Sequence, residues 1–347
     1  MENFGSWSVL TTNFIVVLYL ALAGVTFASI LHLANGKWRF QVRYFAVSTA
    51  ALFPLAFVLL LVLLGGGENT FPWLAEAHAG HGEGAHLSGW LNYPFLVVRE
   101  ILGFVLVVVL FGLFIKYQHL TSVSDDPVVH RRFRNIALLI PFAYVLYGTM
   151  VAWDFEMTLL PGWHSASYGV YQFVSMFQGF LAFFVLMLIM LKRSGKVTNE
   201  YKPFVFNYMA QLILAFTILW TYFYFTQYLI MWYGRLPEEM NRFDNMMLYG
   251  LASIWWIFLV LKSFIPFLTF ATWTPNRHSP AVIGFVAICI LVGTWLERYT
   301  WISGSVSPEY YHIPMSSIFD IVVTVVIFAA GWYSVKKVLT HYGLVRA

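Results

Sequence analysis

Two carboxylates and a histidine lie close together in the connection between two apolar runs. Asp154 and Glu156 end one run, and His164 shortly precedes the next. Carboxylates and imidazoles at the edge of a membrane can accept and release protons near neutral pH. The neighbouring Trp153 and Trp163 favour a second interpretation, in which the connection only anchors both runs at the membrane interface. The residue types leave both interpretations open.

A second candidate lies in the outer half of a long apolar run. At helical spacing Trp220, Tyr224, Gln227 and Tyr228 share one face, and Glu238 follows soon after the run. Aromatic walls with hydrogen-bonding groups between them suit a flat quinone ring, or a file of water molecules. The same face also suits plain aromatic packing, with buried amides that bridge helices.

Several charged side chains lie within or at the ends of the apolar runs: Arg99, Glu100, Lys262, Glu297, Arg298 and Asp320. Charges in hydrocarbon are costly, so each one is a functional hypothesis by default. Adjacent helical residues point about 100° apart. We therefore expect Glu297 and Arg298 to meet partners elsewhere rather than each other. Lys262 either snorkels toward the nearer membrane face or stands in a proton path.

The chain offers few ligands for redox cofactors. Cys289 is its only cysteine, whereas an iron–sulfur cluster needs about four thiolates and c-type haem needs two cysteines before a histidine. None of the ten histidines lies deep in an apolar run, which argues against haem b. The histidines at positions 78, 81 and 86 suit Zn or Cu, but the glycines between them favour a solvated loop. We predict no metal site, and metal binding by this loop stays open.

The composition requires a membrane protein. Apolar residues make up 60% and charged residues 10% of the 347 residues, whereas soluble domains carry about 25% charged residues. A helix needs roughly 20 apolar residues to cross the hydrocarbon. The expected fold class is therefore an all-α integral membrane protein with about nine transmembrane helices. The runs are about Val9–Leu33, Val42–Leu64, Tyr93–Ile115, Asn135–Trp153, Ser167–Leu191, Phe204–Trp232, Met246–Thr272, Pro280–Trp301 and Met315–Leu339. Pro141 and Gly148 make the fourth run the weakest.

Basic residues set the expected orientation. Connections on one side hold most of the Lys and Arg residues, and the other side holds only Arg99, Arg235, Arg242 and Arg298. Cytoplasmic connections carry such an excess. We therefore expect a multi-pass protein of the cytoplasmic (inner) membrane, with a periplasmic N-terminus and a cytoplasmic C-terminus. Most carboxylates then lie on the outer side, together with His, Tyr and Trp, and that side is the expected functional face.

Two motifs resemble a known family. Residues 154–169 read D-F-E-M-T-L-L-P-G-W-H-S-A-S-Y-G, which is similar to the family pattern D-W-x-M-S-L-x-P-H-W-x-S-T-x-F/Y-G. A longer pattern of the family matches Phe216, Trp220, Tyr222, Phe223, Phe225, Gln227, Tyr228, Trp232, Tyr233, Pro237, Glu238 and Glu239. The chain thus resembles the NrfD/PsrC-like integral membrane family, and within it the ActF subunits of alternative complex III. The resemblance extends from about Asn13 to Ser305.

Some polar positions depart from the family patterns. Gly162 and Ser263 stand where the family has histidine, and Arg235 stands where it has asparagine. Their loss weakens any copied proton path, although Glu156 and His164 are polar groups that can replace them locally. Family members often have ten spans, one more than predicted here.

The resemblance implies one polytopic domain over residues 1–347, built from two four-helix bundles and one extra helix. The expected parts are 9–153, 167–301 and 315–339. The implied partners are an iron–sulfur subunit, a second NrfD-like membrane subunit and multihaem cytochrome c subunits, besides lipids and without nucleic acid. Haem and iron–sulfur clusters then belong only to those partners. A quinone or quinol is the one cofactor left open for this chain.

The resulting hypothesis is a membrane subunit of a quinol-oxidising respiratory complex. It would support quinol oxidation, electron transfer to partner subunits and proton transfer, and whether the chain is itself catalytic stays open. The expected outer-face proton group comprises Asp154, Glu156 and His164, with Gln227, Tyr228 and Glu238 nearby. The alternatives are a secondary transporter with a site at the membrane midplane and a purely structural anchor. The residues do not decide whether quinone binds here or in the sister subunit, which electron acceptor is used, or whether protons are pumped.

Overall fold

The computed structural model describes residues 4–75, 88–198 and 201–346. In this part of the chain, nine helical segments are long and apolar enough to cross a membrane, which confirms the predicted all-α membrane fold. Their bounds are Phe4–Leu33, Arg39–Gly65, Tyr93–Val123, Pro127–Met157, Tyr168–Arg193, Phe204–Tyr233, Ala252–Thr272, Pro280–Ser303 and Ile318–His341. The loop with the histidines at 78, 81 and 86 lies outside the described residues.

Six of these spans are single helices along their whole described length, and each of the other three joins two or three helical elements. The single helices are α1 (Phe4–Leu33), α5 (Tyr93–Val123), α7 (Tyr168–Arg193), α8 (Phe204–Tyr233) and α12 (Pro280–Ser303), and α13 (Ile318–His341) follows the same form at the end of the chain. The second span joins α2 (Arg39–Val47), η1 (Ser48–Leu52) and α3 (Phe53–Gly65). Short helices between spans are η2 (Gly67–Asn69), α9 (Pro237–Leu248), η6 (Thr274–His278) and η7 (Pro308–Tyr310).

Two spans contain a π-helical turn. The turn η4 (Trp153–Met157) extends α6 (Pro127–Ala152), and the turn η5 (Val260–Phe264) separates α10 (Ala252–Leu259) from α11 (Ile265–Thr272). A π turn inserts one extra residue and is frequently found at functional sites. Both turns carry ionisable side chains, Asp154 and Glu156 in η4 and Lys262 in η5.

Polar caps explain where several helices begin. The side chain of Asn92 accepts a hydrogen bond from the backbone N–H of Phe95 at the start of α5, over 3.1 Å. Asp126 caps α6 in the same way, through the N–H of Val128 at 2.8 Å. Such caps satisfy backbone N–H groups that have no partner in the first helical turn.

The fourth span continues through Pro141, which confirms the predicted span although this proline makes its apolar run the weakest. Proline lacks an N–H group, so it leaves the carbonyl oxygen of Ala137 without its helical donor. Ser29 of α1 replaces that donor, because its Oγ lies 2.7 Å from the oxygen. A neighbouring helix thus satisfies the freed backbone group, as membrane helices require.

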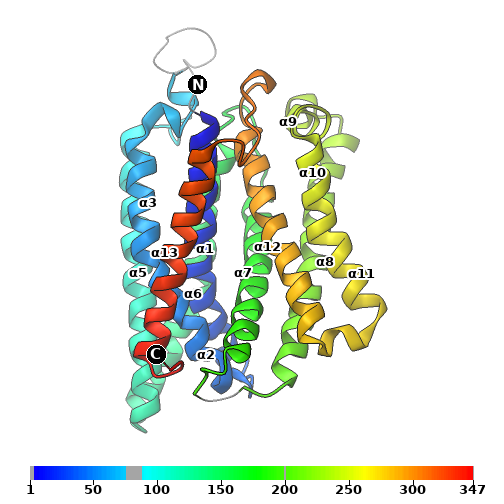
Figure 1. The fold of residues 1–347 in the computed structure, drawn as a ribbon. Helices are drawn as coiled ribbons and strands as arrows, with labels where there is room; N and C mark the ends of the chain where they lie inside the picture. The colour runs from blue at the N-terminus through cyan, green and yellow to red at the C-terminus, as the bar shows by residue number, and fades with distance from the viewer. Residues whose placement is uncertain (1–3, 76–87, 199–200, 347) are drawn as a thin grey trace.

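The helix α1 lies at the centre of the molecule (Figure 1). It packs against α2, α3, α6, α7, α12 and α13, and it is apolar on every side, as a helix buried all round must be. On one side of α1, α5 packs against α6 and α3. On the other side, α7 packs against α8 and α12, and α12 also contacts α10 and η5. The two chain ends lie at opposite ends of the helices (Figure 1).

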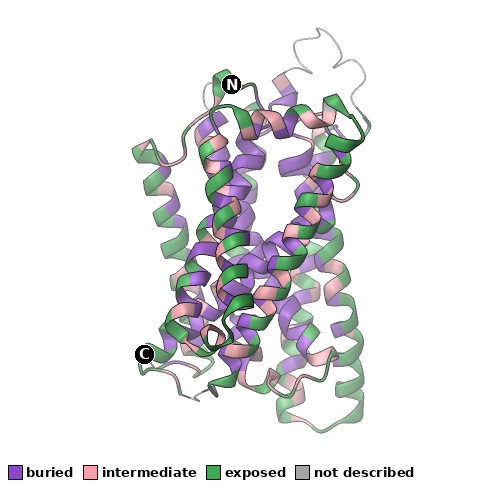
Figure 2. Ribbon diagram, turned by 90° about the vertical axis from the view of Figure 1, so that its right-hand side faces the viewer, coloured by how far each residue is buried: buried purple, intermediate pink, exposed green. Residues whose placement is uncertain are grey.

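The outer faces of the helices are exposed, and the inner faces are buried (Figure 2). Many of the exposed side chains are large and apolar, such as Val98 and Leu106 on α5 and Leu146 on α6. Soluble proteins rarely expose contiguous apolar patches of large area. This distribution fits a helical bundle that is surrounded by lipid.

Candidate functional site

Four charged side chains meet in the interior of the bundle, and we call them the ion cluster: Glu156, Lys262, Glu297 and Arg298. Each of the four is fully buried. Arg298 joins the two acids, because its Nη1 lies 2.8 Å from Oε2 of Glu156 and its Nη2 lies 2.5 Å from Oε1 of Glu297. Lys262 binds the other oxygen of Glu297. The cluster therefore contains two acids and two bases, and it can be electrically neutral.

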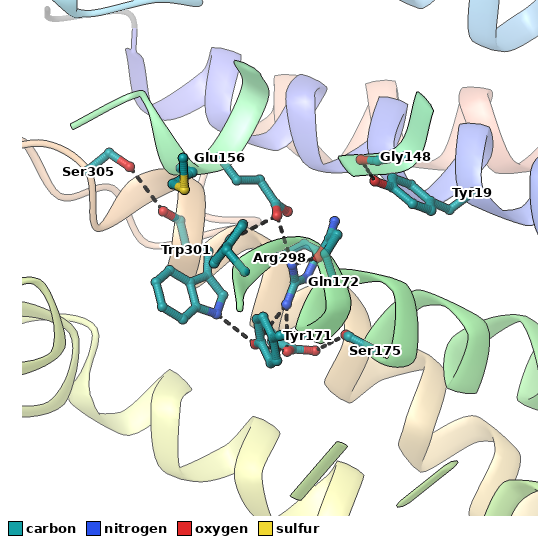
Figure 3. A network of polar contacts seen from close by, with 12 residues as sticks. Tyr19, Gly148, Glu156, Tyr171, Gln172, Ser175, Arg298, Trp301 and Ser305 are labelled. Atoms are coloured by element: carbon teal, nitrogen blue, oxygen red, sulfur yellow. Dashed lines mark hydrogen bonds and ion pairs between the residues drawn. The ribbon is translucent and has the colours of Figure 1, made fainter. Parts of the chain in front are cut away.

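Hydroxyl and indole groups surround Glu297, among them the hydroxyls of Tyr171 and Ser175, which are labelled in Figure 3. Ser175 donates to Oε2 of Glu297 at 2.7 Å, and the indole N–H of Trp220 donates to Oε1 at 2.9 Å. The hydroxyl of Tyr171 also donates to this carboxylate. Together with Lys262 and the neighbouring arginine, these groups give Glu297 five hydrogen-bond donors. Such a fixed set of donors replaces water around a buried charge.

Glu156 receives fewer donors than Glu297. The hydroxyl of Tyr168 donates to its Oε2 at 2.8 Å, beside the bond from Arg298. Its Oε1 has no hydrogen-bond partner among the described residues. Glu156 thus keeps one oxygen free to accept a proton.

The π turn η5 and a glycine bring Lys262 into the cluster. Lys262 lies midway along its span, and Gly293 of α12 lies one helical turn before Glu297. A Cβ atom on Gly293 would come within 2.7 Å of the Lys262 Cγ and 3.1 Å of the Leu261 Cβ. Only glycine therefore lets the lysine stem pass close to α12.

The structure excludes one of the two alternatives for Lys262 and contradicts the expectation for Glu297 and Arg298. Lys262 does not snorkel, because its whole side chain is buried and its ammonium group binds Glu297 and Ser175. Glu297 and Arg298 do contact each other, although adjacent residues leave a helix in different directions. Their side chains are long enough to converge on the same hydroxyl, that of Tyr171.

Arg242 of α9 binds backbone carbonyl groups of η4 and α12 beside the ion cluster. Its guanidinium donates to the carbonyl oxygens of Glu156 at 2.7 Å, Met157 at 3.1 Å and Trp301 at 2.8 Å. It also lies 4.6 Å from the ring centroid of Trp163, where a cation is attracted to the ring face. Burial lowers the pKa of Arg242 to about 10, so the group is still charged at neutral pH. Arg242 therefore ties η4 to the end of α12.

A second buried ion pair lies on α5 and η4. Arg99 binds Asp154 through two nitrogen atoms, with Nε–Oδ2 at 2.7 Å and Nη2–Oδ1 at 2.5 Å. The indole N–H of Trp90 donates to the same carboxylate at 2.7 Å, and the Trp90 ring lies 4.0 Å from the guanidinium. Glu100 is fully buried beside this pair and faces Asp154.

The structure does not gather the three predicted proton-transfer residues into one group. Glu156 belongs to the ion cluster, Asp154 belongs to the separate pair with Arg99, and His164 is exposed. Side chains two residues apart do not face each other on a helix. That spacing is the signal that separates Asp154 from Glu156.

The residues of the predicted aromatic face contact two different parts of the protein. Trp220 contacts the ion cluster, and Gln227 contacts the loop before α7. The rings of Trp220 and Tyr224 stack at 5.2 Å, and the indole of Trp220 reaches the cluster. Gln227 accepts a hydrogen bond from Ser165 at 3.2 Å. Tyr228 is half-buried against Phe243. The backbone of Glu238 lies in α9, and its side chain is outside the described part.

The sequence did not single out the polar face of α7. Tyr171, Ser175 and Gln178 lie on one side of this helix, at the spacing of a helical stripe. The amide of Gln178 donates to the hydroxyl of Thr217 at 2.9 Å and to the carbonyl oxygen of Lys262 at 3.1 Å. A polar stripe in an otherwise apolar run is the signal that could have found these residues.

An apolar cleft of about 490 Å³ lies apart from the ion cluster. It is lined by side chains from α1, α7, α12 and α13 and by Pro314 and Met315. Thr324 and Trp295 are its polar groups, and both are hydrogen-bonded to Asn13. These contacts satisfy both polar groups within the protein.

No protein-family model matches this chain, and a search among curated proteins finds none that is similar to it. The resemblance to the NrfD/PsrC-like family therefore rests on the sequence motifs, and it stays a prediction.

Proposed function

We propose that this chain is a membrane subunit of a quinol-oxidising respiratory complex of the alternative complex III type, and that its ion cluster transfers protons. The observation that carries the proposal is the cluster of four fully buried charges. A buried ion pair is seldom the most stable solution, because desolvation offsets its attraction. Charges inside a membrane protein usually mark ion or proton pathways.

The cluster has the groups that proton transfer requires. Quinol oxidation releases two protons and two electrons, and the protein accepts the protons with positioned acids and bases. The ammonium group of Lys262 donates to Ser175 at 2.7 Å and also to Glu297. A proton can move along these hydrogen bonds without a large movement of heavy atoms. The free oxygen of Glu156 offers the cluster a further acceptor.

Redox cofactors are assigned to the partner subunits in this proposal. The implied partners are an iron–sulfur subunit, a second NrfD-like subunit and multihaem cytochromes. The face of Trp220 and Tyr224 is filled by their own stacked rings and by Phe258. A quinone ring would have to separate these side chains, so we assign the face to the wall of the ion cluster.

The proposed location is the cytoplasmic membrane, with the N-terminus on the periplasmic side. The distribution of lysine and arginine supports this orientation. The ion cluster then lies in the periplasmic half of the membrane, because Glu297 is about 9 Å from the end of its helix at 1.5 Å per residue. Quinol oxidation on that side would release its protons outward. A C-terminal reporter that is active only in the periplasm would contradict this orientation.

Two other functions receive less support. A secondary transporter is expected to have broken helices at corresponding positions of two repeats. Here η4 ends its span, whereas η5 lies in the middle of another span, so the two irregular turns do not correspond. A purely structural anchor needs no buried charges, and an apolar core of the same shape would be at least as stable.

Purification of the full chain in mild detergent tests membership of the complex. Mass spectrometry of the co-purifying chains should identify an iron–sulfur protein and multihaem cytochromes. The proposal would be contradicted if the chain were recovered without partner chains and if membranes that lack this chain oxidised quinol at the normal rate.

A further inference from the structure

A cavity of about 780 Å³ lies between the segments that begin α2 and α8. Its wall is formed by residues from 37–41, around the start of α2, and from 202–212, around the start of α8. The helix α2 and the C-terminus lie at the same end of the bundle (Figure 1). None of the four charges of the ion cluster lines this cavity, so it is a separate site.

The polar part of the cavity is positively charged. Lys37 lies directly before Trp38 and the start of α2, Lys202 lies shortly before α8, and both lysine side chains are exposed and line the cavity. Neither ammonium group is in an ion pair with a described residue. Among the described residues, no carboxylate lines the cavity. The two lysines are therefore available to bind an anion.

A hydrogen bond holds the two lysine-bearing segments together. The backbone N–H of Lys202 donates to Oε1 of Gln41 in α2 over 2.8 Å, although the two residues are 161 positions apart in the chain. The ring of Trp38 packs between two further helices, with centroids 5.8 Å from Phe27 of α1 and 5.8 Å from Tyr208 of α8. These contacts fix both sides of the cavity relative to each other.

The cavity becomes apolar along α8. Phe204, Tyr208 and Leu212 line it at intervals of about one helical turn, so they lie on one face of the helix. This face extends for about 12 Å from the first turn of α8, at 1.5 Å per residue. Phe204 and Tyr208 are exposed. The cavity thus combines a charged end with an apolar wall that follows a membrane-spanning helix.

An anionic phospholipid has the same order of charged and apolar groups. Its phosphate would lie at Lys37 and Lys202, and an acyl chain would lie along the apolar face of α8. Basic pockets between transmembrane helices bind anionic head groups in this way. Tryptophan and tyrosine are enriched at the level of the head groups, which fits Trp38 and Tyr208. A free phosphate ion would use only the charged end and would leave the apolar wall without a partner.

We propose that this cavity binds one anionic phospholipid of the surrounding membrane, with its phosphate held by Lys37 and Lys202. Gln211 also lines the cavity, and its amide can form a hydrogen bond with the polar head group. In the proposed orientation this end of the bundle faces the cytoplasm, where the leaflet carries anionic lipids. Binding requires neither quinol oxidation nor proton transfer, so the inference goes beyond the proposed function and can fail independently of it.

Native mass spectrometry of the purified full chain in mild detergent measures lipid binding. The wild type should bind one molecule of phosphatidylglycerol about tenfold or more tightly than zwitterionic phosphatidylcholine. Lys37→Gln with Lys202→Gln should weaken the binding of phosphatidylglycerol by about tenfold or more, because each lysine near an anionic lipid contributes a factor of about five. Equal binding of the two lipids by the wild type would overturn the proposal, and so would unchanged binding in the double variant.

Lys336→Gln with Lys337→Gln is the matched control. This variant removes the same charge from exposed positions of α13 near the C-terminus, outside the cavity. It should bind phosphatidylglycerol as the wild type does. An equal loss of binding in both double variants would show that only the general surface charge attracts the lipid, and the proposal would then be wrong.

Inorganic phosphate distinguishes a lipid site from a site for a free anion. Added to the wild type at the same concentration as phosphatidylglycerol, it should not displace the lipid, because it makes no contact with the apolar wall along α8. Displacement of the lipid by phosphate would overturn the assignment to a phospholipid. This comparison needs no variant, so its result does not depend on how well a substituted chain folds.

Discussion

The two buried charge sites differ in how their charges balance. The ion cluster holds two acids and two bases, so both acids can stay ionised. The other site has Arg99 as its base but two acids, Asp154 and Glu100. The cluster can therefore hold fixed charges, whereas the second site has one acid in excess, and we expect that acid to hold a proton.

The donors around the acids show the same difference. Glu297 receives hydrogen bonds from five groups, whereas Glu100 receives none of good geometry from the described residues. Donors that are fixed in place stabilise a charge without reorganisation. The surroundings of Glu297 thus stabilise an ionised carboxylate, whereas those of Glu100 favour a neutral acid.

The largest expected effect comes from removing the base that joins the cluster. Arg298→Leu leaves Glu156 and Glu297 buried with only Lys262 between them. Breaking a buried pair costs about 3–5 kcal/mol, so the protein in detergent should melt at a clearly lower temperature. Arg131→Leu on the exposed surface of α6 is the control. Equal melting of both variants would contradict a stabilising cluster.

A smaller loss of stability is expected when Gly293 of α12, which lies against Lys262, is replaced. Gly293→Ala places a methyl group within contact distance of Lys262 and should cost about 1–3 kcal/mol by overpacking. Gly112→Ala on α5 is the matched control, because its added Cβ meets no atom within 4 Å. That change should be neutral or slightly stabilising, as alanine favours helices. Thermal melting measures the stability of both variants. A lower melting temperature for Gly112→Ala than for Gly293→Ala would show that Lys262 can move away from the added methyl group.

The smallest effect is expected for Asp154→Asn in the unbalanced site. Glu100 can then lose its proton and become the ion that balances Arg99. We expect a loss of about 1 kcal/mol, the net value of a typical hydrogen bond. The infrared C=O band of the protonated Glu100 carboxyl group should weaken at the same time. A band of full intensity in this variant would show that the two acids are not coupled.

The sequence predicts the spans well, because length and apolarity alone decide them. The weak fourth span is informative, since the sequence marks Pro141 but cannot show that Ser29 replaces its missing hydrogen bond. That compensation comes from another helix. The apolar run therefore predicts the span itself, but not the side chain of the neighbouring helix that completes its hydrogen bonding.

The site was harder to predict than the fold. The sequence marked Lys262, Glu297 and Arg298 as charges in apolar runs, but nothing in their spacing shows that they converge. Their meeting depends on the π turn η5 and on the space beside Gly293. The residue Arg242 was assigned to a connection, because a short helix that folds back onto the bundle has no strong sequence signal.

The most direct test of proton transfer removes one acid and one base together. Lys262→Met with Glu297→Gln keeps the cluster neutral, since Glu156 and Arg298 still balance each other. The control is Asp126→Asn, which keeps the cap of α6, because asparagine caps helices as well as aspartate.

The measurement is quinol oxidation per assembled complex. The proposed function predicts that the double variant assembles but turns over about 10²-fold or more slowly, as expected when a general acid–base group is lost. The control should turn over at the wild-type rate. Wild-type turnover in the double variant would contradict the central claim, and the ion cluster would then have no part in proton transfer.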